Sequence, residues 1–419
     1  MKKRLISAFA LLFFAVPMLA QQPEQWSMHR GPNGQGISTA TGLPTQWSDT
    51  ENIAWKTPIP GEGWSSPVIW NDHIFLTSAT DNGKECRVIA VDRKSGDILW
   101  NKHVLSQETG QRHPRNSRAT PTPATDGQRV YAAFLNGHFA ALDFAGNVIW
   151  TNTELDFNSQ HGFGTSPMIY GDLLIVAVNP TRGNDGFMTP WDKAYLWALD
   201  KNTGKERWRG TRVMSRIGHS TPVVIKVDGK DQILSMAGDV IQGFEPATGE
   251  LIWTVRHSGE PAVPIPAIGD GMIFTSTRIS EPILGIKTDG KGDVTDTHVV
   301  WQQPRNSPMV ASFLYVNSVV YAAAESGTFA ALDPANGSIL WERRLRGGRP
   351  DSSPIYADGH IYVTTHEGIT TVLKPNADPK VAAEVIAVND IGKTVQATLG
   401  IAGKQIFLRT ETELWCIGK

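Results

Sequence analysis

Residues 331–341 read Ala-Leu-Asp-Pro-Ala-Asn-Gly-Ser-Ile-Leu-Trp and predict a β-hairpin. One strand ends just before Asp333, which opens a tight turn, and Gly337 supplies the positive φ that a reversing chain needs. The returning strand carries Trp341, eight residues after the acid. A single hairpin of this kind says little about a fold, but this one is repeated along the chain.

The spacing of eight residues from an acid to a tryptophan occurs in four hairpins, and a fifth copy is one residue shorter. A looser copy, with a longer polar turn, ends at Trp301. Repeats of about 40–50 residues, each containing several short strands, are typical of β-propellers. The five good copies are Asp92–Trp100, Asp143–Trp150, Asp200–Trp208, Glu245–Trp253 and Asp333–Trp341.

A second recurring piece, Ser or Thr near Pro, precedes an alternating apolar strand in each repeat. Proline has no backbone N–H to donate to a neighbouring strand. It therefore suits the start of an inner or edge strand, where no such hydrogen bond is needed. Together with the hairpin, this piece defines a unit of four antiparallel strands, which we label A to D from the inside outward. We assign the piece to residues 66–67, 120–123, 166–167, 221–222, 264–266, 307–308 and 353–354.

Seven such units fill residues 65–390, and residues 394–416 contain strands A, B and C but no D. Residues 52–57 supply the missing strand, with Trp55 in the position of the signature tryptophan. We therefore predict an all-β fold: an eight-bladed β-propeller of four-stranded antiparallel blades, whose ring is closed by the N-terminal strand joining the C-terminal blade. Closure of this kind leaves no free sheet edge at the junction of the two ends.

The N-terminal 20 residues predict a secretory signal peptide, with Lys2, Lys3 and Arg4 before an apolar run. That run is too short for a membrane span, and no cysteine follows it to carry a lipid anchor. The predicted location is therefore periplasmic or extracellular. We divide the chain into the signal peptide (1–20), a lead-in segment (21–50) and the propeller (51–419). Cys86 and Cys416 are expected to be free thiols, because the repeat places them too far apart to bridge.

The repeat resembles the pyrroloquinoline-quinone-like (PQQ-like) propeller repeat, in which the signature tryptophans dock each blade onto the next. This resemblance covers nearly all of residues 51–419, and the lead-in from Trp26 to Pro67 looks like that of exported bacterial members. Two groups with different activities share the repeat. The chain is similar to members of both groups: the propeller lipoprotein of the outer-membrane β-barrel assembly machinery, and the quinoprotein dehydrogenases.

Charge is distributed unevenly between the connections and the rest of the chain. The connections from strand D of one blade to strand A of the next hold 13 Lys and Arg against 6 Asp and Glu, although the whole chain has a net charge of −2. In a propeller these connections share one face with the B–C turns, so we predict a basic loop face around the channel mouth. Either an anionic ligand or a protein partner would suit it, or its arginines only cover apolar edges. The residues closest to the predicted mouth are Arg118, His161, Arg216, His219, Arg305 and Arg349.

An insertion between strands B and C of the third unit adds aromatic residues to the same face. Phe187 and Trp191 are the candidates for a protein-binding ridge, although they could equally fold back and form a small hydrophobic cluster within the loop itself. The glycines of residues 31–36 have no strand before them and no helix after them, which excludes a nucleotide-binding loop. Nucleic acid is an unsuitable partner for an exported protein of pI ≈ 6.6 whose basic residues lie in loops.

Two functions follow from these observations. The first is an exported non-catalytic scaffold that binds an envelope protein, or an anionic small molecule or polymer, through the basic loop face; it needs no cofactor. The alternative is a PQQ-dependent quinoprotein dehydrogenase that oxidises an alcohol or sugar with the quinone and Ca²⁺. The resemblance implies adjacent cysteines over the quinone in such enzymes, and the chain has only Cys86 and Cys416.

Overall fold

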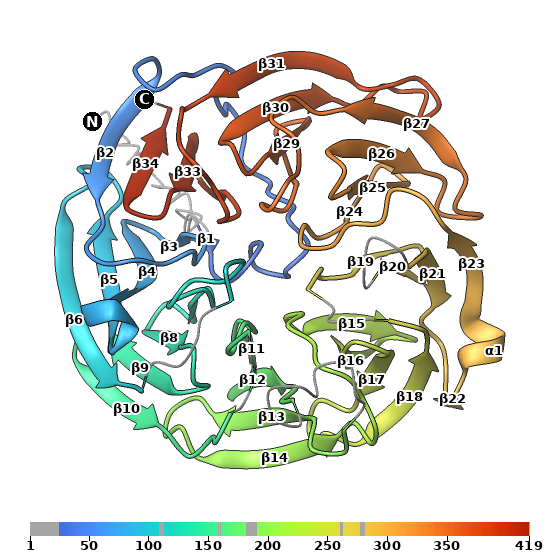
Figure 1. The fold of residues 1–419 in the computed structure, drawn as a ribbon, viewed down its shortest axis with the longest axis horizontal. Helices are drawn as coiled ribbons and strands as arrows, with labels where there is room; N and C mark the ends of the chain where they lie inside the picture. The colour runs from blue at the N-terminus through green and yellow to red at the C-terminus, as the bar shows by residue number, and fades with distance from the viewer. Residues whose placement is uncertain are drawn as a thin grey trace, which may run out of the picture.

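The computed structural model describes residues 25–108, 113–157, 159, 161–181, 191–259, 263–276 and 281–418. The predicted signal peptide and Phe187 lie outside these residues. Strands in the described part form eight sheets around a central axis, which confirms the predicted eight-bladed propeller (Figure 1). The only helical segments among these residues are the single turn α1 (Thr295–His298) and one 3₁₀ turn (Asp81–Gly83), and none of them could span a bilayer.

In each of the first four blades, the strands are given in order from the channel outward. Blade 1 contains β3 (Val68–Trp70), β4 (His73–Thr80), β5 (Glu85–Asp92) and β6 (Ile98–Ser106). Blade 2 contains β7 (Ala124–Thr125), β8 (Arg129–Ala133), β9 (Phe139–Asp143) and β10 (Val148–Asn152). Blade 3 contains β11 (Met168–Tyr170), β12 (Leu173–Val178), β13 (Tyr195–Asp200) and β14 (Glu206–Thr211). Blade 4 contains β15 (Val223–Val227), β16 (Lys230–Met236), β17 (Val240–Phe244) and β18 (Leu251–Arg256).

The remaining blades complete the ring. Blade 5 contains β19 (Ala267–Gly269), β20 (Met272–Thr275), β21 (Ile283–Lys287) and β23 (Val299–Gln303). Blade 6 contains β24 (Leu314–Val316), β25 (Val319–Ala323), β26 (Thr328–Leu332) and β27 (Ile339–Arg344). Blade 7 contains β28 (Ile355–Ala357), β29 (His360–Thr364), β30 (Ile369–Lys374) and β31 (Glu384–Asp390). Blade 8 contains β32 (Gly400–Ala402), β33 (Gln405–Arg409), β34 (Glu413–Ile417) and the N-terminal β2 (Ile53–Pro58).

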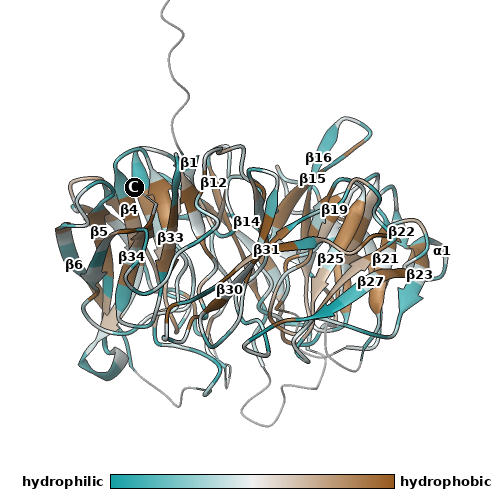
Figure 2. Ribbon diagram, turned by 90° about the horizontal axis from the view of Figure 1, so that it is seen from above, coloured by the Kyte–Doolittle hydropathy of each residue, from teal (hydrophilic) through white to brown (hydrophobic). Residues whose placement is uncertain are grey.

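Two short strands extend blades 1 and 4. The strand β1 (Gln25–Trp26) pairs with the inner strand β3 of blade 1. The long turn of blade 5 contributes β22 (Gly292–Asp293), which lies parallel to the outer strand β18 of blade 4. Seen from the side, the β15–β16 hairpin projects from the face that carries the A–B turns (Figure 2). We call the opposite face, which bears the connections between blades and the B–C turns, the linker face.

The ring closes as predicted. β2 lies antiparallel to β34, with Trp55 opposite Cys416 and Lys56 opposite Trp415. The ammonium group of Lys56 also lies 3.7 Å from the centre of the Trp415 ring. Both cysteines are free thiols buried in the third strands of blades 1 and 8, as the repeat predicted.

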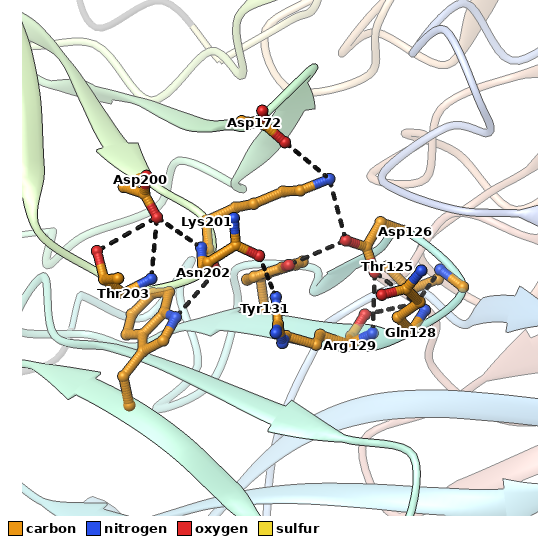
Figure 3. A network of polar contacts seen from close by, with 12 residues as sticks. Thr125, Asp126, Gln128, Arg129, Tyr131, Asp172, Asp200, Lys201, Asn202 and Thr203 are labelled. Carbon is orange, nitrogen blue, oxygen red and sulfur yellow. Dashed lines mark hydrogen bonds and ion pairs between the residues drawn. The ribbon is translucent and has the colours of Figure 1, made fainter.

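The signature hairpin joins neighbouring blades through its glycine and its tryptophan. A Cβ added to Gly204 in blade 3 would lie 2.5 Å from the Trp150 ring of blade 2. The Trp150 Nε1 donates a hydrogen bond to the Lys201 carbonyl at 2.9 Å, and Asp200 accepts hydrogen bonds from the amides of Asn202 and Thr203 (Figure 3). The same contact recurs in the pairs Trp55–Gly96, Trp100–Gly146, Trp208–Gly249 and Trp301–Gly337.

A ring of hydroxyl groups links the inner strands. In seven of the eight junctions among the described residues, the amide just before an inner strand donates to a Ser or Thr hydroxyl of the next blade at 2.9–3.1 Å. Blade 5 has Ile265 at this position, which has no hydroxyl, so the junction between blades 4 and 5 lacks this hydrogen bond. Our assignment of Ser307 to this position in blade 6 was wrong, because Ser312 makes the contact and no proline follows it. The ring hydroxyls belong to Ser66, Thr122, Ser166, Thr221, Ser312, Ser353 and Thr398.

The lead-in segment crosses the channel on the side of the hydroxyl ring that faces the A–B turns. Arg30 is fully buried and donates to the Phe313 carbonyl at 2.7 Å, and Gln35 donates to the Pro266 carbonyl at 3.2 Å. Ile37 then lies beside Tyr356 of blade 7. The segment predicted as a separate lead-in therefore contacts blades 5, 6 and 7 and forms a plug at the channel axis.

Candidate functional site

A cavity of about 570 Å³ opens on the linker face, at the channel mouth. All seven ring hydroxyls line it, and His29 of the plug is also among its lining residues. One part of the wall is apolar and contains Val263, Ile265, Met309 and Val310. The cavity has the size typical of small-ligand pockets, which is about 300–1,000 Å³.

Two of the sequence-predicted residues, His161 and His219, lie together in the cavity wall. Their ring centres are 5.6 Å apart, and the ring of His113 from the preceding linker lies 4.4 Å from that of His161, tilted by 48°. Burial, followed by the neighbouring histidines, lowers the pKa of His219 to about 3 and that of His161 to about 4. Burial and the adjacent Arg30 lower the pKa of His29 to about 3. These imidazoles are therefore neutral at pH 7.

Residues 113–116 form a strap across the mouth. Arg115 donates to Glu325 of blade 6 at 2.7 Å and to the Met309 sulfur at 3.3 Å. Asn116 donates to the His161 carbonyl on the other side. The strap thus ties the linker between blades 1 and 2 to the opposite rim, so it narrows access to the cavity.

The buried histidines predict that acid weakens the fold. An unfolded histidine has a pKa near 6.5, so between about pH 6.5 and 4 the unfolded chain binds protons that the folded chain does not. The free energy of unfolding should therefore fall as the pH drops from 7 to 4, by up to about 1.4 kcal/mol per pH unit for each such group. We expect His219→Gln to reduce the dependence of the unfolding free energy on pH by the equivalent of about one proton taken up on unfolding. Urea unfolding at pH 7, 6 and 5 measures this dependence. His298→Gln, on the outer helix α1, is the control, and an identical slope for wild type and His219→Gln would contradict the assignment.

The sequence-predicted arginines do not gather as a set of uncompensated cations. Arg349 lines the cavity, and its Nε lies 3.3 Å from Asp351. Arg118 lies 3.5 Å from Glu62, and Arg216 lies 4.0 Å from Asp239. Arg305 is away from the mouth and pairs with Glu342 of the outer strand β27 at 2.6 Å. Each of these four predicted cations is therefore paired with a carboxylate.

Trp191 is brought beside a surface that the sequence analysis did not single out. Its backbone pairs with Ser215 in the linker between blades 3 and 4, at 2.7 and 3.1 Å. Next to Ser215, Val213 and Met214 expose 49% and 46% of their surface. The available signal was the pair of adjacent apolar residues, Val213 and Met214, between two arginines of the linker.

The backbone of this linker tip is strained. Val213 has a φ of +65°, a conformation that is costly for a β-branched residue. Buried neighbours hold it in place, because Arg212 and Ile217 are almost completely excluded from solvent and the Arg212 amide donates to the Ala194 carbonyl. Strain that persists in a rigid, exposed and apolar tip is typical of a binding surface. We call Trp191, Val213 and Met214 the apolar tip.

The donor set of the cavity does not match a planar tricarboxylate with a calcium ion. Arg115 and Arg349 share Glu325, and Asp351 also faces Arg349, so a carboxylated cofactor would meet acidic groups beside every guanidinium at the mouth. Within the described ranges, no three His, Cys, Asp or Glu side chains are grouped to share a metal ion. A carboxylated cofactor at this mouth would therefore have to displace at least one of these ion pairs.

Comparison with known proteins gives one family, and its relatives include alcohol dehydrogenases and outer membrane assembly factors. The family model described as "Outer membrane protein assembly factor BamB" matches residues 33–180, 146–278 and 237–417. The chain is 23% identical to the quinohemoprotein alcohol dehydrogenase ADH IIB of Pseudomonas putida over 403 residues, which cover 84% of this chain and 56% of the relative. It is 27% identical to the outer membrane protein assembly factor BamB of Yersinia pestis over 250 residues, or 53% of this chain and 56% of the relative.

The chain thus spans about half the length of the curated relatives it matches. Among solved structures, the crystal structure of BamB from Moraxella catarrhalis matches with a TM-score of 0.59 and 15% identity, covering 88% of this chain and 97% of that one. At this level of identity the likeness concerns the fold.

Proposed function

This chain belongs to the family of the outer membrane protein assembly factor BamB, and from that membership we propose that it is a non-catalytic scaffold of the cell envelope that binds a protein partner through its linker face. The observation that carries the proposal is the apolar tip, where Val213 and Met214 stand out from a buried and hydrogen-bonded base. Apolar residues presented rigidly at low entropic cost are the usual centre of a protein interface. Residues 1–20 would direct the chain out of the cytoplasm.

The charge pairs support a protein partner over an anionic ligand. Arg118, Arg216 and Arg349 are each held by a carboxylate, so binding an anion would require an existing ion pair to be broken. A protein that covers Val213 and Met214 needs no such exchange. Arg216, which lies two residues beyond Met214, would then belong to the polar rim of the interface.

The test replaces the apolar tip by charges. We expect Val213→Asp with Met214→Asp to weaken co-purification of the partner from the native envelope by about 10- to 100-fold, because two central apolar contacts are lost. The matched control is Val148→Asp with Ile149→Asp on the outer strand β10, where the exposed fractions are similar at 43% and 44%. If both double variants lost the partner equally, or if neither lost it, the assignment of the binding surface would be contradicted.

A second variant separates binding from folding. Val213→Gly removes the strained side chain from a backbone with positive φ, so the free energy of unfolding should rise by about 1 kcal/mol while binding weakens. Thermal melting and co-purification of the same sample give both results. A variant that is less stable than wild type would show that Val213 serves the fold alone.

The quinoprotein dehydrogenase is the second candidate, and the identity to alcohol dehydrogenase ADH IIB over 84% of the chain favours it. Against it stands the donor set of the cavity, in which Arg115 and Arg349 are already paired. Titration with pyrroloquinoline quinone and Ca²⁺, followed by an alcohol and a dye acceptor, distinguishes the two. Saturable quinone binding with dye reduction would replace the scaffold by the enzyme.

A further inference from the structure

His366 is held in one orientation at the cavity wall. Its Nδ1 donates to the Asp351 Oδ2 at 2.7 Å, and its backbone amide donates to the Arg349 carbonyl at 2.9 Å. An ionised carboxylate only accepts hydrogen bonds, so a proton is on Nδ1, and in the uncharged imidazole Nε2 is an acceptor. Nε2 has no hydrogen-bond partner among the described residues, and His366 lines the cavity with 30% of its side chain exposed.

The charged groups of the cavity cancel one another. Arg115 and Arg349 face Glu325 and Asp351, so two guanidinium groups meet two carboxylates. The imidazoles of His161 and His219 are neutral for the reasons given above. A charged ligand would find no uncompensated partner here, and displacing an existing pair costs more than a single contact returns.

The ring hydroxyls supply donors to the same space. Each ring oxygen already accepts a backbone amide, and except at Thr122, whose Oγ1 also lies 3.4 Å from His29 Nδ1, this leaves the O–H free to rotate toward a ligand. The apolar side chains of Val263, Met309 and Val310 line the same cavity. The cavity thus combines several hydroxyl donors, an imidazole Nε2 held in one direction and apolar lining residues.

We propose that the cavity at the channel mouth binds an uncharged, polyhydroxylated ligand, namely one or two neutral sugar rings, without oxidising it. A sugar hydroxyl donates to His366 Nε2, sugar oxygens accept from the ring hydroxyls, and the C–H face of the sugar packs on the apolar wall. The strap of residues 113–116 controls access, because Arg115 must leave Glu325 for the mouth to widen. The cavity and the apolar tip are different sites, so this proposal does not depend on the partner.

The test is a titration of the full chain with glucose and maltose, followed through the imidazole Cε1–H signals of His366 in NMR spectra. We expect a saturable shift with a dissociation constant tighter than about 0.1 M, and binding at least about 10-fold weaker for glucuronate and for glucosamine. These two probes keep the sugar ring and add a negative or a positive charge. No saturation with either glucose or maltose, or tighter binding of a charged analogue, would overturn the proposal.

Variants assign the site. His366→Phe should weaken glucose binding by about 10-fold through loss of the acceptor, whereas His366→Gln retains an acceptor and most of the affinity. The matched control is His298→Phe, because His298 also lies beside a carboxylate, 3.4 Å from Asp289, but on the outer rim. Equal effects of the His366 and His298 variants would place the sugar elsewhere. The Val213, Met214 double variant should bind glucose as wild type does, so the two proposals fail separately.

Discussion

Deletion of residues 21–60 is expected to abolish the single cooperative unfolding transition of the protein. The deletion removes β2, which pairs with β34 from Ile53 opposite Ile417 to Pro58 opposite Glu413. It exposes the edge of β34 and uncovers Trp415 and Ile417, which are almost fully buried. It also removes the Arg30 plug from the channel. The loss exceeds the whole stability of an ordinary domain, about 5–15 kcal/mol, so a broad transition or aggregation should replace the sharp one.

A permuted chain separates the two contributions. The amide of Gly418 donates to the Asn52 carbonyl at 2.9 Å, so residues 51–60 can follow residue 419 through a short linker and form a hairpin with β34. This variant restores the eighth blade but not the plug, and it should recover a cooperative transition at a lower temperature. Differential scanning calorimetry provides the measurement. Wild-type melting in the simple truncation would show that the ring does not depend on its N-terminal strand.

Gly337→Ala is expected to destabilise the protein by about 3 kcal/mol. Gly337 has a φ of +72°, and a Cβ at this position would lie 2.3 Å from the ring of Trp301 in the preceding blade. The cost combines about 1 kcal/mol for an alanine at positive φ with about 1–3 kcal/mol for overpacking. The indole cannot simply turn away, because its Nε1 donates to the Pro334 carbonyl at 2.8 Å.

Gly359→Ala is the matched control for this prediction. Its φ is +74°, yet nothing lies within 4 Å of the added Cβ, so the variant reports the backbone cost alone. Urea unfolding of both variants should differ by the packing cost, about 2 kcal/mol. Equal midpoints for the two would mean that the signature hairpin is a turn and not a contact between blades.

The architecture was predictable because its determinants are local and repeated. The acid, the glycine and the tryptophan of each hairpin lie within nine residues of one another, and Asp200 and Trp150 act in the structure as that pattern indicated. The hydroxyl ring was harder to read. Its partners are amides of the neighbouring blade, so the local Ser-Pro pattern indicates Ser307 and gives no signal for Ser312, which has no proline after it.

The site was less predictable because its contacts join distant parts of the chain. Arg30 has no local signal of burial, and only the ring brings it to the carbonyls of Phe313 and Pro354. Counting charges over the connections suggested a basic mouth, but Glu325 comes from a B–C turn that this count left out. His366 and Asp351 are fifteen residues apart and gave no motif.

Site-specific photocrosslinking at residue 214 in the native envelope tests the scaffold account most directly, with residue 148 of β10 as the equally exposed control. The account predicts one defined protein adduct from position 214 and none from position 148. An adduct formed equally from both positions, or none from position 214, would contradict the assignment of the linker face as the binding surface.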